Sequence, residues 1–165
     1  MQLRAGLVLL GVLALLWSTG GRLEAAAACP APRLKATVLP FGDGIGRSPV
    51  WAVALDGPDA RVSLIYGKTA LGYRHKILWL VKSSLPHRVT LTISGRDGRL
   101  QYIRISGAKA ARAATLDPRD PPIPPGTARI AEFPSVVFFS RPGCYRVRLT
   151  WPTGTIVVPL RATKE

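Results

Sequence analysis

The chain has 165 residues, and its 23 lysines and arginines outnumber its 9 aspartates and glutamates, which gives a formal net charge of +14. This length allows one domain and is too short for a doubly wound enzyme or a barrel of ordinary size. A hydrophobic fraction of 47% with 19% charged residues excludes a chain that is disordered throughout.

Residues 1–28 have the pattern of a secretory signal peptide. Arg4 supplies a positive charge, residues 7–17 form an apolar run, and four alanines at 25–28 offer small-residue cleavage sites. The apolar run is shorter than the ~20 residues that a membrane-spanning helix needs. We therefore expect a signal helix whose removal lowers the net charge by one unit, and a secreted or extracytoplasmic protein at the cell envelope.

Cys29 follows the alanines directly, and Cys144 is the only other cysteine. Two cysteines in an exported chain favour a disulfide, which would stabilise the fold by ~4–5 kcal/mol if it closes so long a loop. The alternatives are free thiols or a lipid anchor on Cys29. Lipidation would favour a bulky aliphatic residue three positions before the cysteine, where this chain has Ala26. It would also favour an uncharged segment before the cysteine, whereas this chain has Arg22 and Glu24 there. The sequence favours the disulfide and leaves the lipid anchor open.

Short β-rich runs separated by turn residues fill the remainder of the chain, and no sustained helical period occurs. We expect an extended N-terminal segment over 29–48 and one domain over 49–165. The expected strands cover residues 50–55, 61–66, 77–81, 88–94, 99–105, 136–139, 145–151 and 155–160. Residues 77–81 are apolar on both faces, which predicts a central strand covered on both sides. Pro159 predicts an edge position for the last strand.

About seven to eight strands at this spacing are typical of an immunoglobulin-like antiparallel β-sandwich. A Pro- and Ala-rich segment over 106–128 interrupts the pattern and is expected to be a long loop. It is either a solvated crossover between sheets or a partner-binding loop. The glycine-rich residues 42–46 do not open a helix, so we expect a mobile turn there and no phosphate site.

Several short motifs occur in a fixed order along the chain. They are Cys29-Pro30, Lys-Ile-Leu-Trp at 76–79, Leu-Thr-Ile-Ser-Gly-Arg at 91–96, Phe-Pro-Ser at 133–135 and Arg-Pro-Gly-Cys-Tyr at 141–145. In this order they resemble a group of exported bacterial proteins of unassigned function, over most of residues 29–165. The resemblance implies an immunoglobulin-like sandwich and a bridge between Cys29 and Cys144, and it supplies no catalytic residue. Tyr145 stands where similar chains often have Trp. We expect its ring to be buried and its hydroxyl to bond the backbone.

The sequence contains little that predicts catalysis. His75 and His87 are its only histidines, too few for a metal site without further ligands, and we expect surface or rim positions for both. Ser63 or Ser135 could join a histidine and an aspartate in a triad, but no strand–turn–helix nucleophile elbow is present. We therefore expect no catalytic residue, metal or cofactor. The alternative is a small secreted hydrolase.

Eight arginines lie on or beside predicted strands, several of them on the predicted solvent face. They are Arg61, Arg88, Arg96, Arg99, Arg104, Arg146, Arg148 and Arg161. Such a surface attracts anionic cell-wall polymers or lipid headgroups. The expected contacts are Arg88, Arg96, Arg99, Arg104, Arg146 and Arg148. Alternatively, these arginines reflect a general preference for arginine in the composition and bind no partner. Nucleic acid is not expected, because an exported protein rarely meets it and no RNA-type aromatic platform is evident.

Overall fold

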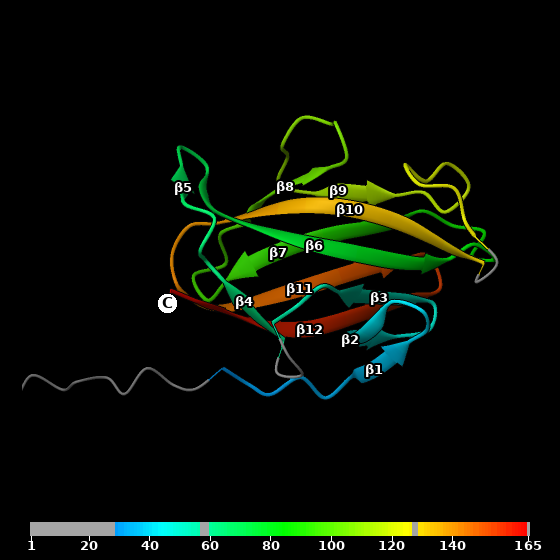
Figure 1. Cartoon of the computed structure of the whole chain (residues 1–165), viewed down its shortest axis with the longest axis horizontal. Coiled ribbons are helices and arrows are strands. Elements are labelled where there is room, and N and C mark those ends of the chain that lie inside the picture. Colours follow the sequence, from blue (N-terminus) through cyan, green and yellow to red (C-terminus); the bar gives the residue numbers. More distant parts are fainter. Residues whose placement is uncertain (1–28, 57–59, 127–128, 165) are drawn as a thin grey trace, which may run out of the picture.

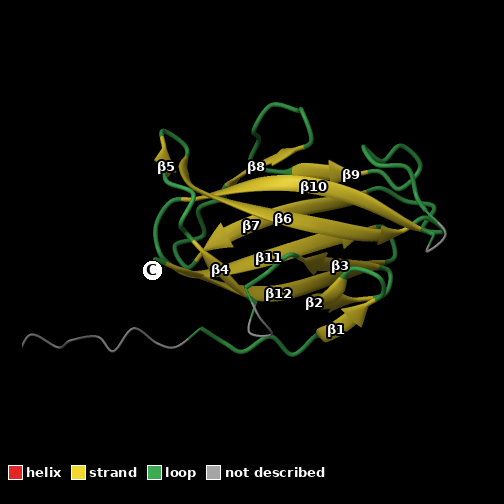
Figure 2. Ribbon diagram, in the orientation of Figure 1, coloured by secondary structure: helices red, strands yellow, loops and turns green. Residues whose placement is uncertain are grey.

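The computed structural model describes residues 29–56, 60–126 and 129–164. The expected signal helix falls in residues 1–28 and lies outside the described residues. All regular structure in the described part of the chain is β-strand, arranged as two sheets that face each other (Figures 1 and 2). The all-β sandwich class predicted from the sequence is therefore confirmed.

The first sheet is called here the β6 sheet, after its longest strand. It has the order β1-β2-β3-β6-β10-β8, and the short β5 also pairs with β6. Its strands are β1 (Lys35–Val38), β2 (Gly42–Arg47), β3 (Val50–Val53), β5 (Lys68–Thr69), β6 (Gly72–Lys82), β8 (Tyr102–Ile105) and β10 (Ile130–Phe139). Neighbouring strands in this sheet are antiparallel.

The second sheet, called here the β11 sheet, has the order β4-β12-β11-β7-β9. Its strands are β4 (Arg61–Ser63), β7 (Val89–Gly95), β9 (Ala114–Leu116), β11 (Gly143–Trp151) and β12 (Gly154–Thr163). The pair β4 and β12 is parallel, and the other pairs are antiparallel. The edge position that Pro159 predicted for the last strand is wrong, because β12 lies between β4 and β11. Pro159 lies beyond the three residues of β12 that pair with β4, so its missing N–H removes no bond from that side.

The central position of residues 77–81 is confirmed, because β6 lies between β3 and β10. The ring of Trp79 is fully buried between the sheets, and Leu80 is fully buried on the other side of the same strand. A second apolar cluster covers that outer side. It contains Val38, Val53, Leu80 and Ile130, with Phe41, Trp51 and Leu78 packed against them. Burial on both faces explains the continuous apolar run.

The mobile turn predicted for residues 42–46 is wrong, because these residues form most of strand β2. A Cβ atom at Gly44 would collide with the carbonyl oxygen of Ala52 in β3, and one at Gly46 with that of Val50. Gly46 also has a φ of +130°. The glycines are therefore needed for the close approach of β2 to β3.

The segment 106–128, expected to be a loop, contains strand β9. Leu116 lies opposite Val89 of β7, and both side chains are fully buried. Burial of Leu116 fixes β9 at the edge of the β11 sheet, although the surrounding Ala residues favour helix over strand and the Pro residues favour neither.

Two expectations for the start of β11 are confirmed. Cys29 and Cys144 form a disulfide, with their Cα atoms 5.4 Å apart. The buried Tyr145 donates its hydroxyl to the carbonyl of Arg141 at 2.5 Å and accepts the N–H of the same residue at 3.2 Å. Its ring packs edge-on against Phe139, with the centroids 4.8 Å apart.

Candidate anion-binding face

Strand β11 exposes arginines at alternate positions. Tyr145, Val147 and Leu149 point into the core, whereas Arg146 and Arg148 are exposed. Successive side chains of a strand point to opposite faces, so these two arginines share one face about 7 Å apart. The alternation of apolar residues and arginines in the sequence is therefore enough to predict that both arginine side chains point outward.

The strand register shows which side chains lie beside these arginines. Arg146 is opposite Ser94 of β7 and Pro159 of β12, and Arg148 is opposite Thr92 and Val157. Cross-strand partners have their side chains on the same face of the sheet. Farther along β12, Arg161 is opposite Cys144 on one side and Arg61 of β4 on the other. Two more arginines thus belong to the same outer surface.

We define the arginine face as this outer surface of the β11 sheet. It comprises Arg61, Arg146, Arg148 and Arg161, together with Thr90, Thr92, Ser94, Thr150 and Thr155. The five described strands of this sheet contain no aspartate or glutamate. Within the described ranges, none of the four guanidinium groups forms an ion pair. Their positive charge is therefore not compensated locally and is available to an external anion.

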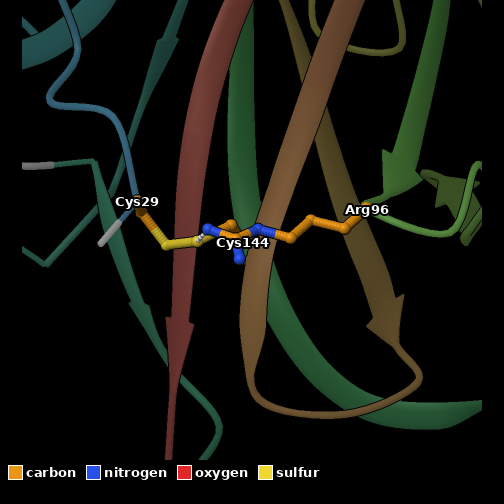
Figure 3. The surroundings of a disulfide bond; sticks show 3 residues. All are labelled: Cys29, Arg96 and Cys144. Carbon is orange, nitrogen blue, oxygen red and sulfur yellow. Dashed lines mark hydrogen bonds between the residues drawn. A yellow bond between two sulfur atoms is a disulfide. The ribbon is translucent and has the colours of Figure 1, made fainter. Parts of the chain in front are cut away.

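The disulfide lies at one end of the arginine face. Arg96 extends from the turn after β7 across β11, and its Nη2 atom lies 3.4 Å from the Cys144 sulfur (Figure 3). A groove of about 600 Å³ begins beside it. The groove is lined by Pro30, Ser94, Gly95, Arg96, Gly98, Cys144, Tyr145, Arg146, Val157 and Pro159. It combines two arginines with an apolar wall, which suits an anionic group carried on a less polar framework.

The six arginines expected as contacts do not lie on one surface. Arg146 and Arg148 are on the arginine face, and Arg96 lies at its end. Arg104 lies on β8 of the opposite sheet. Arg99 has its Nε atom 4.0 Å from Asp97 in the turn between β7 and β8.

Arg88 belongs to a local ion cluster at the other edge of the β11 sheet. The Asp117 carboxylate accepts hydrogen bonds from Nε of Arg88 at 2.7 Å and from Nε and Nη2 of Arg119, both at 3.0 Å. These bonds hold the pKa of Asp117 well below its ordinary value, Arg119 contributing most. Arg88 therefore shares one carboxylate with Arg119, which offsets part of its charge and holds its side chain at this edge.

Arg61 and Arg161 were not among the expected contacts, although both lie on or beside predicted strands. Val157, Pro159 and Arg161 alternate with buried residues of β12, and this alternation is the sequence signal that places Arg161 outside. The parallel pairing of β4 with β12 brings Arg61 beside it. No local sequence pattern predicts that pairing.

His75 is buried, contrary to the surface or rim position expected from the sequence. It occupies an inward-facing position of β6, and its Nδ1–H donates to the carbonyl oxygen of Ser63 at 3.0 Å. The backbone N–H of Ser63 in turn donates to the Asp56 carboxylate. These contacts use the backbone of Ser63 and therefore do not form the hydroxyl–imidazole–carboxylate chain of a triad.

The other candidate catalytic residues lie elsewhere. The Ser135 hydroxyl is bonded to Trp79 and Ile77 in the core. His87 lies in the connection after the end of β6, whereas His75 lies inside that strand, seven residues before its last residue, Lys82. In the part of the chain that the structure describes, no three His, Cys, Asp or Glu side chains are grouped to hold a metal ion.

The chain matches no protein-family model, no curated protein sequence and no solved structure. Among the described residues, no helix is long and apolar enough to cross a membrane.

Proposed function

We propose that this protein is an exported, non-catalytic, immunoglobulin-like sandwich at the cell envelope, and that its arginine face binds an anionic polymer. The observation that carries the proposal is the group of four guanidinium groups without ion pairs to described residues, on a sheet whose described strands have no acidic residue. Guanidinium groups bind carboxylates and phosphates through paired hydrogen bonds, which makes arginine well suited to such partners.

A polymer fits the shape and the chemistry of this face. The surface follows extended strands, and Arg146 and Arg148 repeat along β11 at about 7 Å. Ser94, Thr92 and Thr150 present hydroxyl groups on the same face, which can bond the hydroxyls of a polyol or sugar chain. An acidic polysaccharide offers both the charges and the hydroxyl groups that these side chains recognise.

Three observations support the immunoglobulin-like topology and the extracytoplasmic location. Two β-sheets pack face to face around the buried Trp79. Tyr145 bonds the backbone four residues upstream near the start of a strand, as in the tyrosine corner of immunoglobulin-like domains. The Cys29–Cys144 disulfide is typical of an oxidising compartment outside the cytoplasm.

Binding to alginate, an anionic polyuronate, tests the proposal, with neutral dextran as the uncharged comparison. The informative variant carries Arg146→Gln and Arg148→Gln. Arg104→Gln is the matched control, because Arg104 is an exposed strand arginine on the opposite sheet. We expect the double variant to lose about tenfold in affinity at low salt, corresponding to about 1.4 kcal/mol for two exposed charges.

The Arg104→Gln control should bind alginate with the affinity of the unmodified protein. Neither the control nor the unmodified protein should bind dextran. Unchanged alginate affinity in the double variant, or an equal loss in the control, would overturn the assignment to this face.

A further inference from the structure

Exposed apolar side chains lie close together in the sequence in the connection from β4 to β6. This segment, residues 64–73, contains the paired strand β5 and the start of β6 and is called the hairpin here. Ile65, Tyr66 and Leu71 are 59%, 47% and 39% exposed. Of the seven large apolar side chains that are exposed among the described residues, these three fall within seven consecutive positions. Single exposed apolar residues need no explanation, but a group of them indicates an interaction surface.

The hairpin has a defined conformation. Lys68 pairs with Tyr73 across β5 and β6, and the Thr69 hydroxyl donates to the carbonyl of Gly72 at 3.0 Å and accepts the N–H of Leu71 at 3.2 Å. Both Nε and Nη2 of Arg74 donate to the carbonyl of Tyr66, at 3.1 and 2.8 Å. These bonds hold Tyr66 and Leu71 in place, so their exposure is a property of the folded hairpin.

Basic side chains surround the apolar group. Lys68 lies over the ring of Tyr73, 5.7 Å from its centroid, and Arg74 is exposed beside Tyr66. The strand register brings the start of β6, the end of β7, the turn between β10 and β11 and the end of β12 to this same end of the sandwich (Figure 2). Those segments contribute Arg96, Arg99, Arg141 and Lys164.

The acidic groups described near this end are already engaged. Asp97 lies between Arg99 and Arg141, at 4.0 and 3.7 Å from their guanidinium nitrogens. The Asp56 carboxylate accepts the backbone N–H of Ser63. The end as a whole is therefore apolar at its projecting hairpin and positively charged around it.

We propose that this end of the sandwich docks on an anionic lipid bilayer. Ile65, Tyr66 and Leu71 enter the headgroup region, and Lys68 and Arg74 contact lipid phosphates. Aliphatic side chains combined with tyrosine and flanking basic residues match the polarity gradient of a bilayer interface. Anionic headgroups complement the positive charge that surrounds the hairpin. The hairpin residues are not part of the arginine face, and this inference does not depend on polymer binding there.

Co-sedimentation of the exported protein with phosphatidylglycerol–phosphatidylcholine vesicles tests the inference, with pure phosphatidylcholine vesicles as the uncharged comparison. The hairpin variant combines Tyr66→Ser and Leu71→Ser. Ile123→Ser is the matched control, because Ile123 is 39% exposed, as Leu71 is, but lies outside the hairpin. Near-ultraviolet circular dichroism confirms that each variant is folded.

We expect the unmodified protein to bind the anionic vesicles, and the hairpin variant to bind them at least tenfold more weakly. The Ile123→Ser control and the Arg146→Gln, Arg148→Gln variant should bind as the unmodified protein does. Absence of vesicle binding, retention of binding by the hairpin variant, or an equal loss in the Ile123 control would overturn the proposal. Loss in the arginine variant alone would place the lipid on the arginine face. The hairpin variant keeps the arginine face and should therefore still bind alginate, so that failure of the lipid proposal and failure of the polymer proposal are distinguishable.

Discussion

The indole N–H of Trp79 donates a 2.8 Å hydrogen bond to the hydroxyl of Ser135 across the neighbouring strands β6 and β10. The same hydroxyl donates to the carbonyl of Ile77 at 2.8 Å. Both side chains are buried, and a buried polar group needs a partner to avoid a loss of stability. This chain of two bonds satisfies the indole and ties β10 to β6 in the interior of the protein.

Replacing Ser135 by alanine should destabilise the fold. The substitution leaves the Trp79 N–H buried without its acceptor, at an expected cost of about 1–3 kcal/mol in the free energy of unfolding. Urea denaturation followed by tryptophan fluorescence measures this cost. Ser106→Ala is the control, because Ser106 is exposed. Equal stability of the two variants would mean that the bond contributes nothing.

The same two residues show what the sequence could and could not predict. The apolar run at 77–81 predicts a central strand correctly, because burial on both faces leaves a local signal. The partnership of Trp79 with Ser135 depends on the pairing of strands more than fifty residues apart, and no local pattern specifies that register. Strand β2 has no signal in the sequence, because close packing against β3, and not β propensity, requires its glycines.

The candidate site was predictable to a similar extent. Alternation in β11 is enough to place Arg146 and Arg148 outside. The sequence could not show that Arg104 belongs to the opposite sheet, since sheet membership follows from topology. Nor could it show that Asp117 forms an ion pair with Arg88, because the two residues are brought together only when β9 pairs with β7.

Loss of the Tyr145 hydroxyl alone should have a modest effect. Tyr145→Phe removes the two bonds to the backbone of Arg141 and keeps the ring packed on Phe139. We expect a loss of about 0.5–1.5 kcal/mol. Tyr145→Ala also empties the ring's place in the core and should cost about 3–5 kcal/mol. Thermal unfolding of the two variants separates the contribution of the hydroxyl from that of the ring. A phenylalanine variant as unstable as the alanine variant would show that the ring contributes little.

Removal of the disulfide should destabilise the protein without changing its fold. Cys29→Ser with Cys144→Ser opens a loop of 115 residues, which in the chain-entropy model costs at most ~4–5 kcal/mol. Urea denaturation of this variant, compared with the oxidised protein, measures the loss. Intact mass of the exported protein with and without reductant checks the bond itself. A mass unchanged by reductant, or a lipid adduct on Cys29, would contradict the bridge in the native protein.

The Asp117 cluster predicts how stability responds to acid. The bonds from Arg119 and Arg88 depress the pKa of the folded carboxyl below the ordinary value of 3.8. The stabilisation is therefore fully present above about pH 4 and is lost as the pH falls below that value. Asp117→Asn should lower stability at neutral pH, and its difference from the unmodified protein should shrink below pH 4. Asp120→Asn, at an exposed neighbour, is the control. A difference independent of pH would contradict this role of the carboxylate.

The measurement that tests the arginine face most directly is the dependence of alginate affinity on salt concentration. Each arginine that neutralises a polymer charge releases a counterion, so that removing arginines makes the dependence on salt less steep. We predict a steep decline for the unmodified protein and for Arg104→Gln. The Arg146→Gln, Arg148→Gln variant should show a shallower decline, with the three curves converging at high salt as the charges are screened. Identical slopes for all three proteins would contradict binding through the arginine face.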